Sequence, residues 1–348
     1  MSIKSAVVAA AATCLVTSSV ALACSRVTLI GGDNIVVTGR TLDWMQPMDT
    51  NLWALPAGLR HNGAVAVNPL IWTSKYGSLV AGAYDQASID GMNEAGLVAN
   101  TLYLSVMDPG PRDPRRPGLS VAAWAQYLLD NFATVDEAVA ALGKSDMQVL
   151  VTVLPDGEKG VGHLAISDPS GDSAIFEYIG GKLVIHHDRK YSVMTNEPSF
   201  DQQLALTAYW GDIGGAAFLP GTSRPADRFV RASYYLAQAP QTTSVRTSIA
   251  TIFSIMRDVS VPLGNSTPGR PNVASTWWRS AADQTHRTYY FDATESPNVF
   301  WVSLDKPNLK QGAPVMKLDL QGNPIFAGEV SAEFKPAKQF DFLLATGS

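Results

Sequence analysis

Apolar and polar residues alternate along several parts of the chain with the period of two that is typical of β-strands. Two β-branched runs, CSRVTLI (residues 24–30) and NIVVTGRT (residues 34–41), flank Gly31-Gly32-Asp33-Asn34. This pattern predicts a β-hairpin. Residues 84–104 hold further strand-like sequence, in which we interpret Asp90-Gly91 as a turn. The hairpin would place Cys24 at the start of a strand.

Further strands are predicted in the middle of the chain and near its end. Short apolar stretches are separated by DGEKG, PSGD, GG and DR, which predicts an antiparallel meander over residues 149–155, 163–168, 173–179, 182–187 and 191–195. A final hairpin is predicted over residues 285–304.

Helical periodicity occurs in separate blocks. Residues 120–142 predict a helix with Ser120 as its N-cap and a break near Thr134, and further helices are predicted over 198–210, 224–239 and 243–258. Because strands and helices are segregated, the pattern favours an α+β fold with antiparallel sheets and outer helices. No repeat or linker is evident, and the proline-rich stretch 109–117 runs directly into a helix. We therefore expect a single domain over residues 24–348.

Residues 1–23 predict a secretory signal peptide. Lys4 supplies a positive charge, Ala6–Val16 is apolar, and Ala21-Leu22-Ala23 has the small-x-small pattern that signal peptidase accepts. The apolar run is short for a membrane span, although an uncleaved anchor is the alternative. Cleavage after Ala23 would release a periplasmic or secreted protein with no membrane attachment.

Charge and motif content exclude several function classes. Without Lys4, 25 basic residues face 31 acidic ones, and the short PRDPRR stretch at 111–116 is too small to neutralise several phosphates. We therefore expect no nucleic-acid partner. Gly160–Ala165 matches a dinucleotide fingerprint, but a strand pattern follows it. The histidines of the chain are His61, His163, His186, His187 and His286. None of them has the spacing of metal ligands, so neither a metal nor a cofactor is expected.

Cysteine content directs attention to residue 24. The chain has two cysteines, and Cys14 would be lost with the signal peptide. Cys24 would then be both the sole cysteine and the first residue. It could be a small buried residue, the acceptor of a lipid, or a nucleophile whose own α-amine takes the thiol proton. The position of Leu22 fits ordinary signal peptidase better than a lipoprotein signal.

The chain resembles the choloylglycine hydrolase family, which contains bile salt hydrolases and penicillin V acylases. The resemblance spans nearly all of the mature chain and rests on ordered motifs that follow Cys24: GRTLDW at 39–44, DGMNEAGL at 90–97, MTNEPSF at 194–200, LPG at 219–221 and DRFVR at 227–231. It implies an N-terminal-nucleophile hydrolase with a four-layer αββα sandwich and no cofactor.

The resemblance also implies roles for particular residues. Cys24 would attack an amide carbonyl to give a thioester, Asp43 would hold the α-amine, and Arg40 would favour the thiolate. Asn196 and the backbone of Tyr103 would form the oxyanion hole, and Arg228 would complete the polar network.

The expected substrate is a small N-acyl amine. Tyr103 stands where many bile salt hydrolases carry Asn, which resembles some penicillin V acylases, and export resembles the Gram-negative branch active on penicillin V and N-acyl homoserine lactones. An acyl pocket would be lined by Trp44, Met45, Trp72, Tyr84 and Tyr103.

Two alternatives to this function are a conjugated bile salt hydrolase and a non-catalytic exported lipoprotein or binding protein of the same fold. The family resemblance also implies a homo-oligomer, a tetramer in some members. The chain between Asn196 and Arg228 is shorter than in the Gram-positive members.

Overall fold

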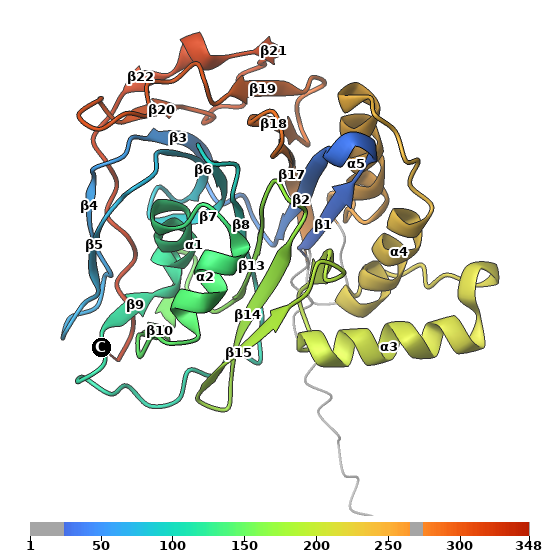
Figure 1. Cartoon of the computed structure of the whole chain (residues 1–348), viewed down its shortest axis with the longest axis horizontal. Helices are drawn as coiled ribbons and strands as arrows, with labels where there is room; N and C mark the ends of the chain where they lie inside the picture. Colours follow the sequence, from blue (N-terminus) through green and yellow to red (C-terminus); the bar gives the residue numbers. More distant parts are fainter. Residues whose placement is uncertain (1–23, 265–273, 348) are drawn as a thin grey trace, which may run out of the picture.

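Two β-sheets lie face to face between layers of helices (Figure 1). The structure, a computed structural model, describes residues 24–264 and 274–347. The predicted signal peptide, residues 1–23, lies outside the described residues. This four-layer αββα arrangement confirms the expected α+β class.

The first sheet has seven strands and carries the N-terminal hairpin. In sheet order these are β16 (Val193–Thr195), β1 (Ser25–Ile30), β2 (Val36–Trp44), β17 (Ser275–Asp283), β18 (Thr288–Ala293), β19 (Phe300–Ser303) and β21 (Gly328–Glu329). All neighbours are antiparallel except β19 and β21.

The second sheet has nine strands. In sheet order they are β15 (Lys182–His187), β14 (Ser173–Ile179), β13 (His163–Ser167), β8 (Val98–Leu102), β7 (Ala87–Asn93), β6 (Ser78–Ala83), β3 (Asn51–Leu55), β20 (Met316–Leu318) and β22 (Lys335–Pro336). Three small pairs complete the strands: β4 (Arg60–Asn62) with β5 (Ile71–Thr73), β9 (Gly118–Ser120) with β10 (Gln148–Leu150), and β11 (Thr152–Val153) with β12 (Lys159–Gly160).

Helices cover the outer faces of both sheets. On the nine-stranded sheet lie α1 (Val121–Asn131) and α2 (Val135–Leu142), and on the seven-stranded sheet lie α4 (Pro225–Ala237) and α5 (Val245–Asp258). Helix α3 (Phe200–Ile213) projects beside α4 (Figure 1). Short 3-10 turns occur at Gly32–Asn34, Gly215–Ala217 and Ser331–Glu333.

The predicted helix starts and the first hairpin are confirmed. Ser120 Oγ accepts a hydrogen bond from the backbone of Ala122, and Thr134 caps the second helix by accepting from Glu137. Each cap satisfies a backbone N–H that a helix leaves without an internal partner. Strands β1 and β2 pair in register from Ser25 with Thr41 to Ile30 with Val36.

The predicted turn at Asp90-Gly91 is wrong. Both residues lie inside β7, and the chain turns after Asn93, where Gly96 has a φ of +89°. Gly91 is required by close packing rather than by a turn, since a Cβ there would meet the carbonyl oxygen of Leu79 at 2.6 Å. Asp90 is buried and faces the other sheet, where it accepts a hydrogen bond from Ser280.

The meander is only partly as predicted. Strands β13, β14 and β15 are sequential neighbours, but β10 and β11 pair elsewhere and β16 crosses to the seven-stranded sheet beside β1. Strand β17, which the sequence analysis missed, pairs with β2. These long-range pairings leave no local pattern in the sequence.

Two apolar cores hold the layers together. One lies between the sheets and extends to α4 and α5, and the other lies between the nine-stranded sheet and α1 and α2. Helix α5 packs tightly on β2, where a Cβ on Gly39 would come within 2.7 Å of Ile252.

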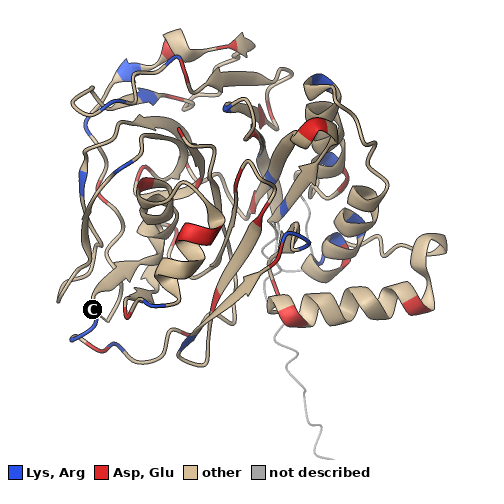
Figure 2. Cartoon of the chain, viewed as in Figure 1, with Lys and Arg blue, Asp and Glu red and all other residues tan. Residues whose placement is uncertain are grey.

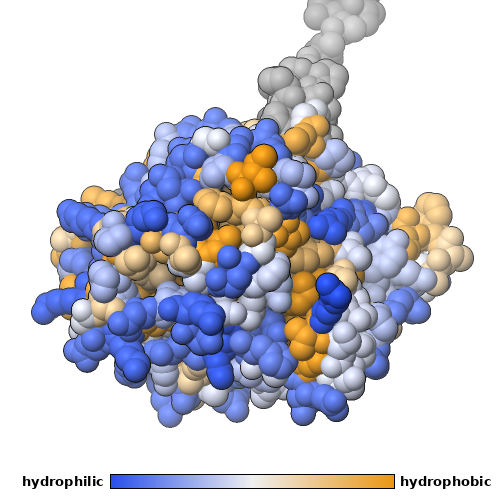
Figure 3. Space-filling view, turned by 90° about the horizontal axis from the view of Figure 1, so that it is seen from above, coloured by the Kyte–Doolittle hydropathy of each residue, from blue (hydrophilic) through white to orange (hydrophobic). Residues whose placement is uncertain are grey.

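Charged residues are spread over many elements, as Figure 2 shows. Within residues 24–264 and 274–347, no helix is both long and apolar enough to cross a membrane. Figure 3 shows apolar residues grouped in the middle of the face seen from above, with polar residues around them.

Candidate active site

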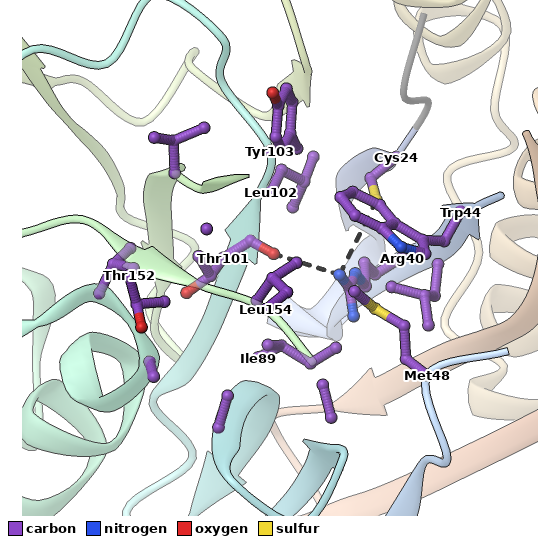
Figure 4. Close-up of a pocket in the computed structure, with 17 residues that line it drawn as sticks. Cys24, Arg40, Trp44, Met48, Ile89, Thr101, Leu102, Tyr103, Thr152 and Leu154 are labelled. Carbon is purple, nitrogen blue, oxygen red and sulfur yellow. Dashed lines mark hydrogen bonds between the residues drawn. The ribbon is translucent and has the colours of Figure 1, made fainter. Parts of the chain in front are cut away.

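Cys24 lies at the edge of a cavity between the two sheets, immediately before β1 (Figure 4). Its side chain is buried, with 3% of the residue exposed. The empty space, including the part that opens to solvent, is about 570 Å³. The cavity is lined by Cys24, Arg40, Leu42, Trp44, Met48, Ala83, Ala87, Ile89, Thr101, Leu102, Tyr103, Val121, Ala122, Thr152, Leu154, Gly160 and Val161.

Strand register brings the polar residues of the site together. Ser25 pairs with Thr195 on one side and with Thr41 on the other. Asn196 directly follows the last residue of β16, so it lies beside Cys24 although 172 positions separate them in the sequence. The central strand β1 thus holds the thiol between residues of two distant segments.

Asn196 and Arg228 bind the backbone of Cys24. The nitrogen of Cys24 donates to Asn196 Oδ1. In the full-length chain this nitrogen belongs to the Ala23–Cys24 peptide bond. Arg228, fully buried on α4, donates to the carbonyl oxygen of Cys24 at 2.6 Å and to Asn196 Oδ1 at 3.1 Å. Asn196 Nδ2 donates to the carbonyl oxygen of Tyr103 at 2.8 Å.

Asp43 lies next to the thiol but is held by hydroxyl groups. Its carboxylate accepts from Thr276 and, at 3.1 Å, from Thr41, and it lies 3.8 Å from Arg228. The Cys24 thiol donates to the backbone carbonyl of Asp43 at 3.7 Å. Burial raises the pKa of the Asp43 carboxyl to about 6, although the charge of Arg228 and the hydroxyls of Thr276 and Thr41 oppose this rise.

Arg40 supplies the cation beside the sulfur. Its Nη2 lies 3.9 Å from Cys24 Sγ and 3.1 Å from the carbonyl oxygen of Thr101, and its guanidinium lies over the ring of Trp278. Asp90 lies 3.8 Å away on the opposite side. Burial nevertheless raises the pKa of the Cys24 thiol, with Arg40 opposing it. The charge of Arg40 lowers the pKa of the thiol, which is the direction that the sequence predicts, but the effect of burial is larger.

The aromatic residues proposed for the pocket divide into two groups. Trp44 and Tyr103 line the cavity, and their rings meet edge to face with centroids 5.7 Å apart. Met45 packs against the core between the sheets without lining the cavity. Tyr84 does not line the cavity either, and its hydroxyl donates to Asp156, the carboxylate that also accepts from Trp44.

Trp72 is not a pocket residue, because it lies in the second core. There it stacks on His61 at 5.1 Å and donates to the buried Asp130 at 2.7 Å. Its position near the motifs in the sequence did not indicate which core it joins.

Two residues that the sequence analysis missed support the site. Gln203 of α3 is fully buried and donates to the carbonyl oxygens of Asn196 and Pro198 at 2.8 and 2.7 Å. Asp156 accepts hydrogen bonds from the indole of Trp44 at 2.7 Å and the hydroxyl of Tyr84 at 2.9 Å. Neither residue belongs to a recognised motif, although DGEKG marks the turn that carries Asp156.

The side chains whose spacing would suit a metal ion lie away from the cavity. Within the described ranges, one group with suitable ligand spacing is found, Asp136, Asp172 and His187, on the outer surface. His163 and His186 both contact the buried Glu177 at 2.9 and 3.3 Å. The residues around Cys24 offer a thiol, two guanidinium groups, a carboxylate and an amide, a set suited to acyl transfer.

Comparison with known proteins identifies the family. A model described as linear amide C–N hydrolases, choloylglycine hydrolase family, matches residues 24–325. A penicillin V acylase from Pectobacterium atrosepticum is 47% identical, with 93% of both chains covered. A bile salt hydrolase/transferase from Clostridium perfringens is 24% identical, with 82% of this chain and 94% of the relative covered.

Solved structures of similar proteins have the same fold. The penicillin V acylase from Agrobacterium tumefaciens superposes with a TM-score of 0.85 at 48% identity, covering 92% of this chain and 99% of that chain. A conjugated bile acid hydrolase from Clostridium perfringens gives a TM-score of 0.75 at 21% identity over 87% of this chain and 98% of its own, which shows the same fold. The chain therefore belongs to the choloylglycine hydrolase family, and it is a hydrolase of linear amide C–N bonds.

Proposed function

We propose that the protein hydrolyses small N-acyl amines with Cys24 as an N-terminal nucleophile, which cleavage after Ala23 exposes. The observation that carries this proposal is the position of the Cys24 thiol at the edge of an apolar cavity, beside Arg40 and with its backbone held by Asn196 and Arg228. The family match also begins at residue 24. Export to the periplasm is part of the same proposal.

The proposed reaction uses both groups of an N-terminal cysteine. The free α-amine, with an ordinary pKa of about 7.7–8.0, takes the thiol proton as Cys24 Sγ attacks the amide carbonyl. The raised pKa of the buried thiol makes such a base necessary, because the resting group holds its proton. The amine leaving group departs with a proton, and water then hydrolyses the thioester. Asp43 and Asn196 orient the α-amine.

Negative charge develops on the carbonyl oxygen of the substrate in the transition state, and hydrogen-bond donors are needed to stabilise it. Asn196 Nδ2 carries two N–H groups, one of which is directed to the carbonyl of Tyr103. We assign the other N–H and the backbone N–H of Tyr103 to the oxyanion hole. Loss of one such donor costs about 10²–10³ in rate.

Substrate preference follows from the cavity lining. Apart from Cys24, Arg40, Thr101 and Thr152, the lining is apolar or backbone, with the rings of Trp44 and Tyr103 beside the thiol. Flat and linear apolar groups suit this space, so we propose phenoxyacetyl and medium-chain acyl amides, namely penicillin V and N-acyl homoserine lactones. The 47% identity to a penicillin V acylase supports the first of these.

The test combines processing with turnover. N-terminal sequencing of the exported protein should begin at Cys24, and its intact mass should equal that of an unmodified chain. Cys24→Ala should abolish turnover of penicillin V, and Cys24→Ser, which keeps a weaker nucleophile, should retain at most a small fraction. A lipid adduct on Cys24, or near-normal activity of Cys24→Ala, would contradict the mechanism.

A further inference from the structure

A small hairpin forms one wall of the cavity. Strands β11 and β12 pair only through Thr152 with Gly160 and Val153 with Lys159, in a two-stranded sheet of their own. Thr152 and Leu154 line the cavity from this side (Figure 4). Gly160 and Val161 of the same hairpin region also line it. An isolated two-stranded hairpin is marginally stable, so contacts outside the ladder must fix this wall.

The base of the hairpin is held by the C-terminal residues. Thr152 Oγ1 donates to the carbonyl oxygen of Leu344 at 2.7 Å, and Thr346 N donates to the carbonyl oxygen of Val151 at 2.9 Å. These bonds fix the open end of the hairpin, at the start of β11. They do not fix the turn at its tip, which other contacts must hold.

The tip is held by one carboxylate. Asp156 Oδ2 accepts from Trp44 Nε1 at 2.7 Å and from the Tyr84 hydroxyl at 2.9 Å, while Oδ1 accepts from the backbone of Glu158 at 3.0 Å. Trp44 belongs to β2 and Tyr84 follows β6. Asp156 therefore joins the hairpin to both sheets.

Trp44 makes this contact relevant to the substrate. Its indole lines the cavity beside Tyr103, and 2% of the residue is exposed. A buried indole N–H requires an acceptor, and Asp156 provides it. The carboxylate thus fixes two walls of the cavity at once: the Trp44 ring and, through the hairpin, Leu154.

We propose that Asp156 is a specificity-determining residue: by holding the β11–β12 hairpin against Trp44 and Tyr84, it sets the length of acyl group that the cavity accepts. This inference rests on the proposed function, because it takes the cavity as the acyl site. With this acceptor removed, the hairpin tip loses its hydrogen bonds to both sheets, and the wall formed by Leu154 can move outward. Short acyl groups then lose contact and longer ones gain room.

The first test compares acyl-length profiles of three variants. Asp156→Ala removes charge and acceptor, Asp156→Asn removes the charge but keeps an acceptor oxygen, and Glu158→Gln removes a charge from the same hairpin without touching the contact. Steady-state kinetics on N-acyl homoserine lactones from C4 to C12 should show Asp156→Ala shifted about tenfold in kcat/KM toward long chains, mainly through KM, which is the scale of one apolar group in a pocket. Asp156→Asn and Glu158→Gln should keep the wild-type profile.

A second readout does not depend on turnover. Lys159 is exposed on β12, and tryptic cleavage after it requires the hairpin to open. Cleavage at this site should be faster in Asp156→Ala than in the wild-type protein and unchanged in Asp156→Asn. Tyr84→Phe, which removes one of the two donors, should give an intermediate rate.

The outcomes separate the two proposals. A wild-type protein that cleaves neither penicillin V nor any of these acyl homoserine lactones would overturn the proposed function. An Asp156→Ala variant with the wild-type acyl profile and the wild-type cleavage rate would overturn the role of Asp156 alone. Equal effects of Asp156→Asn and Asp156→Ala would also overturn it, since the acceptor would then not be the cause.

Discussion

Gln203 offers a sharp test of how the site is held. Its Nε2 donates to the carbonyl oxygens of Asn196 and Pro198, and its Oε1 accepts from Thr195 Oγ1 at 3.2 Å. Gln203→Met keeps the volume of this buried side chain and removes every one of these bonds. A buried carbonyl left without its donor costs about 1–3 kcal/mol, so with partial relaxation we expect an unfolding free energy lower by about 2–4 kcal/mol.

The same substitution should slow turnover. Without Gln203, the segment that carries Asn196 loses its connection to α3, and a loosely held oxyanion donor loses part of the factor of about 10²–10³ that such a donor supplies. We expect kcat to fall by about tenfold or more, with KM little changed.

The matched control is Gln202→Met, one position away on the same helix and exposed. Urea unfolding followed by circular dichroism, together with steady-state kinetics, measures both effects. The reasoning fails if Gln203→Met and Gln202→Met differ by less than about 0.5 kcal/mol, the usual range for surface changes, and share the same kcat.

Three further predictions concern pH, metals and substrate choice. Burial raises the pKa of the Asp43 carboxyl to about 6, and the ionised form is present above that value. Besides the loss of activity that protonation of the α-amine causes below about pH 8, kcat/KM should therefore show a second decline as pH falls through about 6, and Asp43→Asn should be slow at every pH and lack this second decline. Incubation with EDTA followed by assay should leave activity unchanged, since an N-terminal thiol and amine need no Lewis acid; a loss that added metal restores would contradict this. Penicillin V and medium-chain acyl homoserine lactones should be preferred over conjugated bile salts by tens-fold to hundreds-fold in kcat/KM, because an apolar pocket contributes about 1–3 kcal/mol per group; kinetics with bile salts as the best substrates would refute the preference.

Local signals in the sequence predicted most of the elements correctly. The β1–β2 hairpin, the cap at Ser120, the break near Thr134 and the helices α3, α4 and α5 all depend on neighbouring residues, and the structure has them where the patterns indicated. The exceptions depend on packing contacts that the local pattern does not reveal. Asp90-Gly91 has the composition of a turn, but close contact with β6 and the buried position of Asp90 place it inside a strand.

The residues of the candidate site were likewise predictable only in part. The positions of Cys24, Arg40, Asp43, Asn196 and Arg228 around one point agree with the motif order of the family, which carried long-range information that periodicity does not. Contacts made by residues outside those motifs were missed, because nothing in a single sequence indicates that a glutamine of α3 or an aspartate in a turn reaches the cavity.

The order of strands around the thiol has a consequence for synthesis of the chain. Strand β1 pairs with β16, and its other neighbour β2 pairs with β17, which ends at Asp283. A ribosome must therefore deliver more than two hundred residues after Cys24 before that part of the sheet can close. Sheets built from such distant pairings fold slowly, and until then the edges of β1 and β2 are exposed to other chains. Rapid overproduction should therefore favour aggregation, and slower synthesis should raise the yield of folded protein.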